Sequence, residues 1–257
     1  MGYGEGSAFP IGEGRYPPLG TAAPDRAMNR ETDQGNAAMA EGRLVIGTKR
    51  YSSWSMRGWL MVQLAGLDVE EVVVPLAGGG GTTAIKAISP NGMVPYLEHR
   101  GARMWESIAI AEYCAEFKAD LWPRKRAARA HARSIAAEMH AGFRALRMAM
   151  PMNLGREFPG HGRNPDSLAD IARVEAIWAE AIGEYGGPFL TGVDFTLADA
   201  MYAPVVARFL TWQPELNGTS RAYVAAVRAH PLVDRWYREA AAEPADWLLE
   251  KYENPAL

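Results

Sequence analysis

The order of strand and helix patterns between residues 43 and 118 constrains the fold of this chain most. Leu44-Val45-Ile46-Gly47 is a short apolar run bounded by charge, which predicts a buried strand. Residues 57–67 carry apolar side chains at helical spacing, with Gly66 in the position of a C-cap. The valine-rich run 70–76 predicts a second strand. About a dozen helical residues separate the two strands, which is the length that a parallel crossover needs.

Two further strands and two helices are predicted after the glycine run at residues 78–81. Residues 82–88 have room for at most two helical turns before the turn sequence Ser89-Pro90-Asn91-Gly92. The hairpin spacing of 94–98 and 103–106 predicts two short strands, and residues 107–118 predict a closing helix. The order βαβ, α, ββ, α predicts a thioredoxin-like α/β domain with a mixed four-stranded sheet.

The rest of the chain has helical periodicity only, so we expect an all-α C-terminal domain. The linker is Leu121-Trp122-Pro123-Arg124, because its proline stops a helix. The predicted domains are 43–121 and 122–257, preceded by a flexible extension over the glycine- and proline-rich residues 1–42. An overcalled start codon, with Met39 as the native start, is one hypothesis for this extension. The helices are expected over 126–149, 167–184, 196–212, 220–229 and 231–242.

Charge and composition exclude several classes of protein. The chain has 27 Lys and Arg against 30 Asp and Glu, a net charge of −3 that is too balanced for bulk binding of nucleic acid. Its one cysteine, Cys114, excludes an internal disulfide and a Cys-x-x-Cys redox pair, and its five histidines lack metal-ligand spacing, so we expect no metal. No apolar run of about 18 residues and no signal sequence occur, so we expect a cytoplasmic protein without a membrane partner.

The first motif that carries chemistry is Tyr51-Ser52-Ser53-Trp54-Ser55-Met56-Arg57, at the predicted start of a helix. Helix N-termini present unpaired N–H groups and a partial positive charge, which attract anions, thiolates included. The alternative is ordinary helix capping by Ser53 or Ser55, which needs no chemistry.

The second motif joins the Val94-Pro95 step with Glu106-Ser107, which opens the next predicted helix. A cis peptide before Pro95 would turn the backbone of Val94 toward an open edge that can pair with an extended peptide. Ser107 and the helix N-terminus could hold a carboxylate while Glu106 binds an ammonium group. Here too a capping serine is the alternative.

In these motifs and their order, residues 43 to about 250 resemble the cytosolic glutathione transferase family. The doublet Ser52-Ser53, the third serine and Arg57 look like its zeta class, which includes the maleylacetoacetate isomerases. The run Gly192-Val193-Asp194-Phe195-Thr196-Leu197-Ala198-Asp199 is similar to the family's buried capping box, with Thr196 as N-cap. Glutathione as co-substrate, a small electrophile and a homodimer are what the resemblance implies.

The resemblance also implies roles for individual residues. Ser52 would donate a hydrogen bond to the sulfur of glutathione, with Ser53 as its competitor and Tyr51 as a further alternative. The backbone of Val94 would pair with the cysteinyl part, and the γ-glutamyl end would lie at a Glu-Ser pair. The remaining members of the implied glutathione-binding set are Trp54, Pro95, Glu106 and Ser107.

Other residues remain open as candidates. Zeta members offer a glutamine or lysine near the second helix for the glycine carboxylate, where this chain has Gly78-Gly79-Gly80-Gly81; Lys86 or backbone N–H groups are the substitutes. His140 lies on the helix that would flank the electrophile pocket, but a lone helical histidine is also compatible with a structural role. The methionines of the run 148–152 could line that pocket or fill the core, and Cys114 is expected to be a buried apolar residue.

The expected function is that of a glutathione transferase, whose mechanism must favour the thiolate. A free thiol with a pKa near ~8.5 is only about 3% ionised at neutral pH, and lowering the pKa by ~2 units corresponds to ~2.7 kcal/mol. One charge-assisted hydrogen bond and a helix N-terminus supply that order of energy. The alternatives are a glutathione-dependent cis-trans isomerase of the maleylacetoacetate type, a dehalogenase, and a non-catalytic binding or assembly protein of the same fold.

Overall fold

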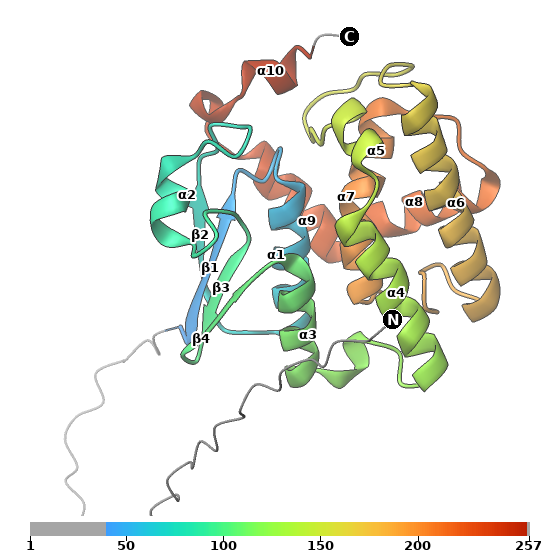
Figure 1. The fold of residues 1–257 in the computed structure, drawn as a ribbon, viewed down its shortest axis with the longest axis horizontal. Coiled ribbons are helices and arrows are strands. Elements are labelled where there is room, and N and C mark those ends of the chain that lie inside the picture. Colours follow the sequence, from blue (N-terminus) through green and yellow to red (C-terminus); the bar gives the residue numbers. More distant parts are fainter. Residues whose placement is uncertain (1–39, 256–257) are drawn as a thin grey trace, which may run out of the picture. The chain divides into compact units, whose positions relative to one another are not determined.

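The computed structural model describes residues 40–255, which form a four-stranded sheet followed by helices (Figure 1). The strand order is β2-β1-β3-β4, with β1 and β2 parallel and the other pairs antiparallel. The thioredoxin-like domain with a mixed four-stranded sheet is confirmed. The strands are β1 (Gly42–Gly47), β2 (Glu70–Val74), β3 (Tyr96–His99) and β4 (Ala102–Trp105).

Helices cover both faces of the sheet, and the alternation of side chains along β1 shows how (Figure 1). Leu44 and Ile46 are buried in the main core with α1 (Ser53–Ala65) and α3 (Ser107–Phe117). Val45, which points to the opposite face, packs in a second cluster with Ile85 of α2 (Thr83–Ile88). The period of two along a strand therefore divides the core into two layers.

The helices of the second half pack around α7, whose residues are almost all buried. α7 and α9 also contact α1, so one continuous hydrophobic core extends from the sheet into the helical half. The all-α C-terminal half is confirmed. Its helices are α4 (Arg126–Ala141), α5 (Arg144–Ala149), α6 (Pro165–Tyr185), α7 (Leu197–Trp212), α8 (Gly218–Ala229), α9 (Pro231–Ala241) and α10 (Glu250–Glu253), with 3-10 turns at Ala119–Leu121 and Ala245–Trp247.

Two predicted helix boundaries are wrong. The helix expected over 126–149 is two helices, because α4 ends at Gly142 and Phe143 takes a left-handed conformation with φ 60°. A Cβ atom on Gly142 would lie 2.8 Å from the carbonyl oxygen of Glu138, so this break requires glycine. α1 begins at Ser53, four residues before the predicted Arg57, and its predicted C-cap at Gly66 is confirmed, with φ 69°.

The buried capping box at the start of α7 is confirmed. The carboxylate of Asp199, which is fully buried, accepts hydrogen bonds from the backbone N–H of Thr196 at 2.8 Å and from that of Leu190 at 2.9 Å. The hydroxyl groups of Thr196 and Tyr223 donate to the same carboxylate. This side chain therefore ties the loop before α7 to α7 and α8.

Two expectations about the ends and the domains of the chain stay predictions. The predicted extension over residues 1–42 lies almost entirely outside the described residues, and the division of the chain at residues 121 and 122 stays a prediction. Within residues 40–255 no helix is long and apolar enough to cross a membrane, and no three His, Cys, Asp or Glu side chains cluster as metal ligands would. Cys114 is buried as predicted, and burial raises the pKa of its thiol to about 12.

Candidate functional site

The serine motif lies at the N-terminus of α1, and Ser52 is the N-cap residue. Its hydroxyl oxygen accepts a hydrogen bond from the backbone N–H of Ser55 at 3.3 Å and lies 2.7 Å from the Ser55 hydroxyl oxygen. Ser55 is fully buried and accepts from the backbone N–H of Gly47 at 2.9 Å. The capping role thus falls on Ser52 and not on Ser53 or Ser55, the two serines considered for it. It ties a hydroxyl to the positive end of a helix.

Ser53 is oriented differently. Its hydroxyl oxygen accepts a hydrogen bond from Nη2 of Arg208 on α7, at 3.3 Å. Arg208 is 5% exposed and also donates to the carbonyl oxygen of Pro204 at 3.0 Å. The two serines that compete for the sulfur therefore have different partners: a second hydroxyl for Ser52 and a guanidinium group for Ser53.

A pocket of about 440 Å³ opens beside these serines, within the range of small-molecule sites. It brings together Ser52, Ser53, Trp54 and Val94, four of the seven residues to which the resemblance gives a catalytic or glutathione-binding role. None of its wall residues is acidic. A larger depression of about 950 Å³ over α7, α8 and α9 contains none of the candidate residues. The other wall residues are Tyr51, Leu76, Gly78, Gly79, Gly80, Thr82, Ile85, Gly92, Met93, Arg147, Pro151, Met152, Arg208 and Tyr252.

Two arginines pack against Trp54, and a third, Arg208, lies elsewhere on the pocket wall. Arg147 and Arg208 line the pocket, and the guanidinium groups of Arg57 and Arg147 lie 4.7 and 4.9 Å from the centre of the Trp54 ring. Nη1 and Nη2 of Arg57, Nη1 of Arg147 and Nε of Arg208 are buried and have no hydrogen-bond partner among the described residues. The site therefore holds positive charge and unused donors.

The pKa shifts of these arginines show the same excess of buried positive charge. Burial lowers the pKa of Arg57, and the neighbouring guanidinium groups of Arg147 and Arg208 lower it further. Burial, followed by the charge of Arg147, lowers the pKa of Arg208 to about 9. Buried charges normally have a partner of opposite sign. A negatively charged ligand in the pocket would provide a partner of opposite sign for these guanidinium groups.

Glu106 and Ser107 lie at the start of α3 and are not part of the pocket wall. Glu106 is the N-cap residue of α3, with φ 68°, and its carboxylate lies 3.5 Å from Nε2 of His140. The Ser107 hydroxyl is buried and lies 3.3 Å from Nδ1 of the same ring, which packs edge-on against Trp54 at 5.3 Å. His140 thus links the Glu-Ser pair to the pocket residue Trp54.

The Val94-Pro95 peptide bond is cis, the case that the sequence analysis considered for its effect on Val94. Val94 lines the pocket, whereas Pro95 packs against α1: a Cβ atom on Gly58 would lie 2.7 Å from the Pro95 ring. Pro95 therefore acts through packing, and only Val94 of this pair borders the pocket.

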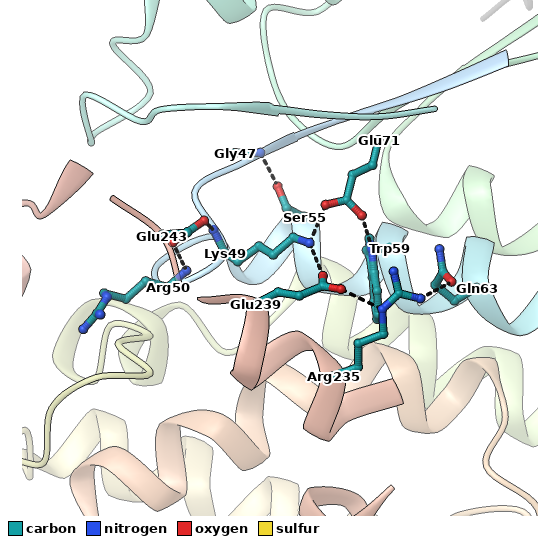
Figure 2. Close-up of polar contacts among 10 residues, drawn as sticks. All are labelled: Gly47, Lys49, Arg50, Ser55, Trp59, Gln63, Glu71, Arg235, Glu239 and Glu243. Carbon is teal, nitrogen blue, oxygen red and sulfur yellow. Dashed lines mark hydrogen bonds and ion pairs between the residues drawn. The ribbon is translucent and has the colours of Figure 1, made fainter. Parts of the chain in front are cut away.

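The loop that presents the serines is attached to α9 (Figure 2). The carboxylate of Glu243, just beyond α9, accepts hydrogen bonds from the backbone N–H groups of Lys49 and Arg50, the latter at 3.1 Å. The Lys49 ammonium is buried between two tryptophan rings and pairs with the carboxylates of Glu71 and Glu239. Residues of α9 and of the segment just after it thus hold the turn that leads into Ser52.

The C-terminal segment forms one wall of the pocket. Tyr252 stacks on Tyr51 with ring centres 5.2 Å apart, and the Tyr51 hydroxyl donates to Glu253 at 2.6 Å. Asn153 donates to the same carboxylate at 3.1 Å and to the carbonyl oxygen of Tyr252 at 2.8 Å. Burial and the Glu253 hydrogen bond raise the pKa of Tyr51, so this hydroxyl stays neutral. Its proton is already donated to Glu253 and not to the pocket, unlike the hydroxyl proposed for the serines.

Sequence reasoning missed Arg147, Arg208 and the C-terminal segment. The arginines carry no motif, and their positions on the pocket depend on tertiary packing. Both alternatives hold for the methionine run: Met150 is in the core, Met152 lines the pocket, and Met148 is 74% exposed.

Two family models match the two halves of the chain. The family model "Glutathione S-transferase, N-terminal domain" matches residues 51–116, and "Glutathione S-transferase, C-terminal domain" matches residues 127–239. A Caenorhabditis elegans protein named "Probable maleylacetoacetate isomerase" is 30% identical over 207 residues, which are 75% of this chain and 95% of the relative. The Rattus norvegicus "Maleylacetoacetate isomerase" is 26% identical over 185 residues, covering 70% of this chain and 84% of the relative.

Solved structures share the fold. A maleyl pyruvate isomerase, described as a bacterial glutathione S-transferase of the zeta class, has a TM-score of 0.60 at 23% identity and covers 79% of this chain and 99% of its own. A Burkholderia glutathione transferase homologue with bound glutathione has a TM-score of 0.60 at 22% identity, with the same coverage. With both family domains in their expected order over most of residues 51–239, this chain belongs to the glutathione S-transferase family.

Proposed function

We propose that this protein uses glutathione to isomerise a small, negatively charged electrophile with a cis double bond conjugated to a carbonyl group, in the manner of a maleylacetoacetate isomerase. The observation that carries the proposal is a set of buried guanidinium donors, on Arg147 and Arg208 of the pocket wall and on Arg57, that have no hydrogen-bond partner among the described residues. Arg57 packs against the wall residue Trp54, and the pocket wall has no acidic residue. Glutathione would bind along Val94, Trp54 and the start of α3.

Ser52 is the proposed donor to the sulfur. Its hydroxyl lies at the N-terminus of α1, and Ser55 behind it can donate to Ser52 once the Ser52 proton turns toward sulfur. Gly47 donates to Ser55, so the three groups would form a chain of hydrogen bonds ending at the thiolate. A bond to an anion contributes about 1.5–3 kcal/mol and the helix terminus a further ~0.3–1 kcal/mol. Ser53 is the alternative donor, but its oxygen already accepts from Arg208.

The positive wall supports an anionic electrophile. Carboxylates accept charge-assisted hydrogen bonds from guanidinium groups, often two at once, and Arg208 and Arg147 have donors to spare. A carboxylate bound there would neutralise a charge that burial now disfavours. A neutral aromatic electrophile would leave the same donors unpaired, which costs free energy in a buried site.

The chemistry of isomerisation fits these parts. The thiolate adds to one carbon of the double bond, and the electron pair moves to the conjugated carbonyl oxygen, which becomes an enolate held by a guanidinium group. Rotation about the new single bond follows. Return of the electron pair expels the thiolate and restores the double bond in the trans form, so that glutathione is regenerated and no proton is consumed overall. Names of the worm and rat relatives support this reaction over others.

Conjugation is the second candidate function, because the same thiolate could attack an aryl or alkyl halide and displace the halide. The family match supports both activities, since they share the step of thiolate attack. The non-catalytic binding protein of the same fold stays a further alternative.

The deciding experiment mixes the purified protein with glutathione and maleylacetoacetate and follows conversion to the trans isomer. The proposal expects turnover that needs glutathione without consuming it. Consumption of glutathione with an aromatic halide, and no isomerisation, would favour conjugation. Failure of both reactions, with the protein folded by circular dichroism, would favour the non-catalytic alternative.

Assembly and location also belong to the proposal. We expect a homodimer, supported by the family match and by exposed apolar side chains such as Trp105 on the edge strand β4, which is 41% exposed. Sedimentation at micromolar concentration tests it, and a monomer would contradict it. A cytoplasmic location suits a co-substrate that must stay a thiol.

A further inference from the structure

The glycine turn before α2 receives a lysine from the far end of the chain. In Figure 1, α10 lies at the end of the sheet where this turn is found. A Cβ atom on Gly78 would lie 2.6 Å from Cε and Nζ of Lys251, and one on Gly79 would lie 3.6 Å from Nζ. Any larger residue at Gly78 would therefore displace the ammonium group.

The backbone conformation of this turn points to the same close approach. Gly78, Gly79 and Gly80 all have positive φ, between 64° and 78°, a region that other residues enter only at a cost. The same three glycines line the pocket that contains Ser52. The turn thus has no side chains at these three positions, forms part of the pocket wall and lies beside the ammonium group of Lys251.

Lys251 is held in place by the residues that follow it. Tyr252 stacks on Tyr51, and Glu253 binds the Tyr51 hydroxyl and Asn153. Among the described residues no carboxylate forms an ion pair with Lys251; its ammonium group lies 4.9 Å from the centre of the Tyr252 ring. An anchored segment therefore places an ammonium group, without an ion-pair partner among the described residues, beside the glycine turn that lines the pocket.

Glutathione carries a carboxylate that could pair with the Lys251 ammonium group. The tripeptide carries an ammonium and a carboxylate at its γ-glutamyl end, the thiol in the middle and a second carboxylate on glycine. With the sulfur at Ser52 and the γ-glutamyl end toward Glu106, the glycine end points to the other side of Ser52, where the pocket reaches Gly78–Gly80. Lys86, the candidate from sequence, packs beside Gly92 instead and is not a wall residue.

We propose that Lys251 binds the glycine carboxylate of glutathione, in a cradle formed by the backbone of Gly78 and Gly79. The assignment rests on the proposed glutathione site but not on the reaction that the site performs. Lys251 supplies from the C-terminal segment the charge that the glycine turn itself lacks.

The test measures the affinity of glutathione by titration calorimetry for the full chain and for Lys251→Met. A partly exposed pair of this kind is expected to give about a five-fold loss of affinity. Lys86→Met is the matched control and should bind as the unmodified chain does. Circular dichroism verifies that each variant is folded, and Lys251→Arg should retain most of the affinity because it keeps the charge.

A second ligand identifies which carboxylate is bound. Glutathione monoethyl ester, blocked at the glycine carboxylate, should bind the unmodified chain about five-fold more weakly, and Lys251→Met should lower its affinity no further. An equal loss for both ligands in Lys251→Met, or no loss for glutathione, would overturn the assignment. Failure of isomerase turnover with this pattern intact would count against the proposed reaction alone, because affinity is measured without turnover.

Discussion

Replacing Ser52 by two different residues separates its capping role from its proposed chemical role. Ser52→Ala removes the hydroxyl that accepts from Ser55 N–H at 3.3 Å, and such a substitution at an N-cap costs about 1 kcal/mol of stability. Ser52→Gly removes the same hydroxyl but costs only a few tenths of a kcal/mol, since glycine is itself tolerated at this position. The two variants therefore differ in stability and share the loss of the donor.

The thiol of bound glutathione should respond equally in both. A charge-assisted hydrogen bond of about 1.5–3 kcal/mol corresponds to ~1–2 pKa units of the thiol, and both variants should raise that pKa by this amount. Ultraviolet absorbance of the thiolate against pH, at saturating glutathione, measures it. Unfolding in urea measures the difference in stability.

One result would refute the assignment. If both Ser52 variants bind glutathione with an unchanged thiol pKa while Ser53→Ala raises it, the sulfur belongs to Ser53. A thiol pKa that follows stability, higher in Ser52→Ala than in Ser52→Gly, would mean that Ser52 acts only through the helix cap.

Three further predictions concern the surroundings of the site. Glu243→Ala should lower the free energy of unfolding by about 2 kcal/mol, because the N–H of Lys49 loses its acceptor, whereas the exposed control Glu215→Ala should change it by less than ~0.5 kcal/mol. Burial lowers the pKa of His140 below 6.5, so the unfolded chain binds a proton more readily and stability should fall as pH falls through 6.5; His140→Gln should flatten that part of the stability curve, and an unchanged curve would contradict the reasoning. Asp199→Ala should cost about 3 kcal/mol or more in urea unfolding, since two backbone N–H groups lose their acceptor; Asp199→Asn, which keeps one acceptor oxygen, should cost less.

Local patterns predicted the sheet and the start of the site well. Alternation and hairpin spacing are properties of a few neighbouring residues, so the order of strands could be predicted without tertiary information. Gly66 marked the end of α1 for the same reason. The break after α4 was missed because apolar side chains continue at helical spacing across it, and only Gly142 and the left-handed Phe143 separate the two helices.

The chemistry of the pocket wall was less accessible. Arg147 and Arg208 belong to helices whose sequence patterns give no sign of a site. Their side chains reach the pocket only because the two helices pack against the serine loop. The C-terminal segment has no periodicity, so Lys251 and Tyr252 gave no signal in sequence. Sequence patterns do not predict contacts between side chains that are far apart in the chain.

The bond between Tyr51 and Glu253 joins residues 202 positions apart. During synthesis the sheet can therefore assemble long before the last wall of the pocket exists. A nascent chain that has made its serine loop still lacks the segment that carries Tyr252. Binding of nascent chains of increasing length to immobilised glutathione would show at which chain length the binding site is complete.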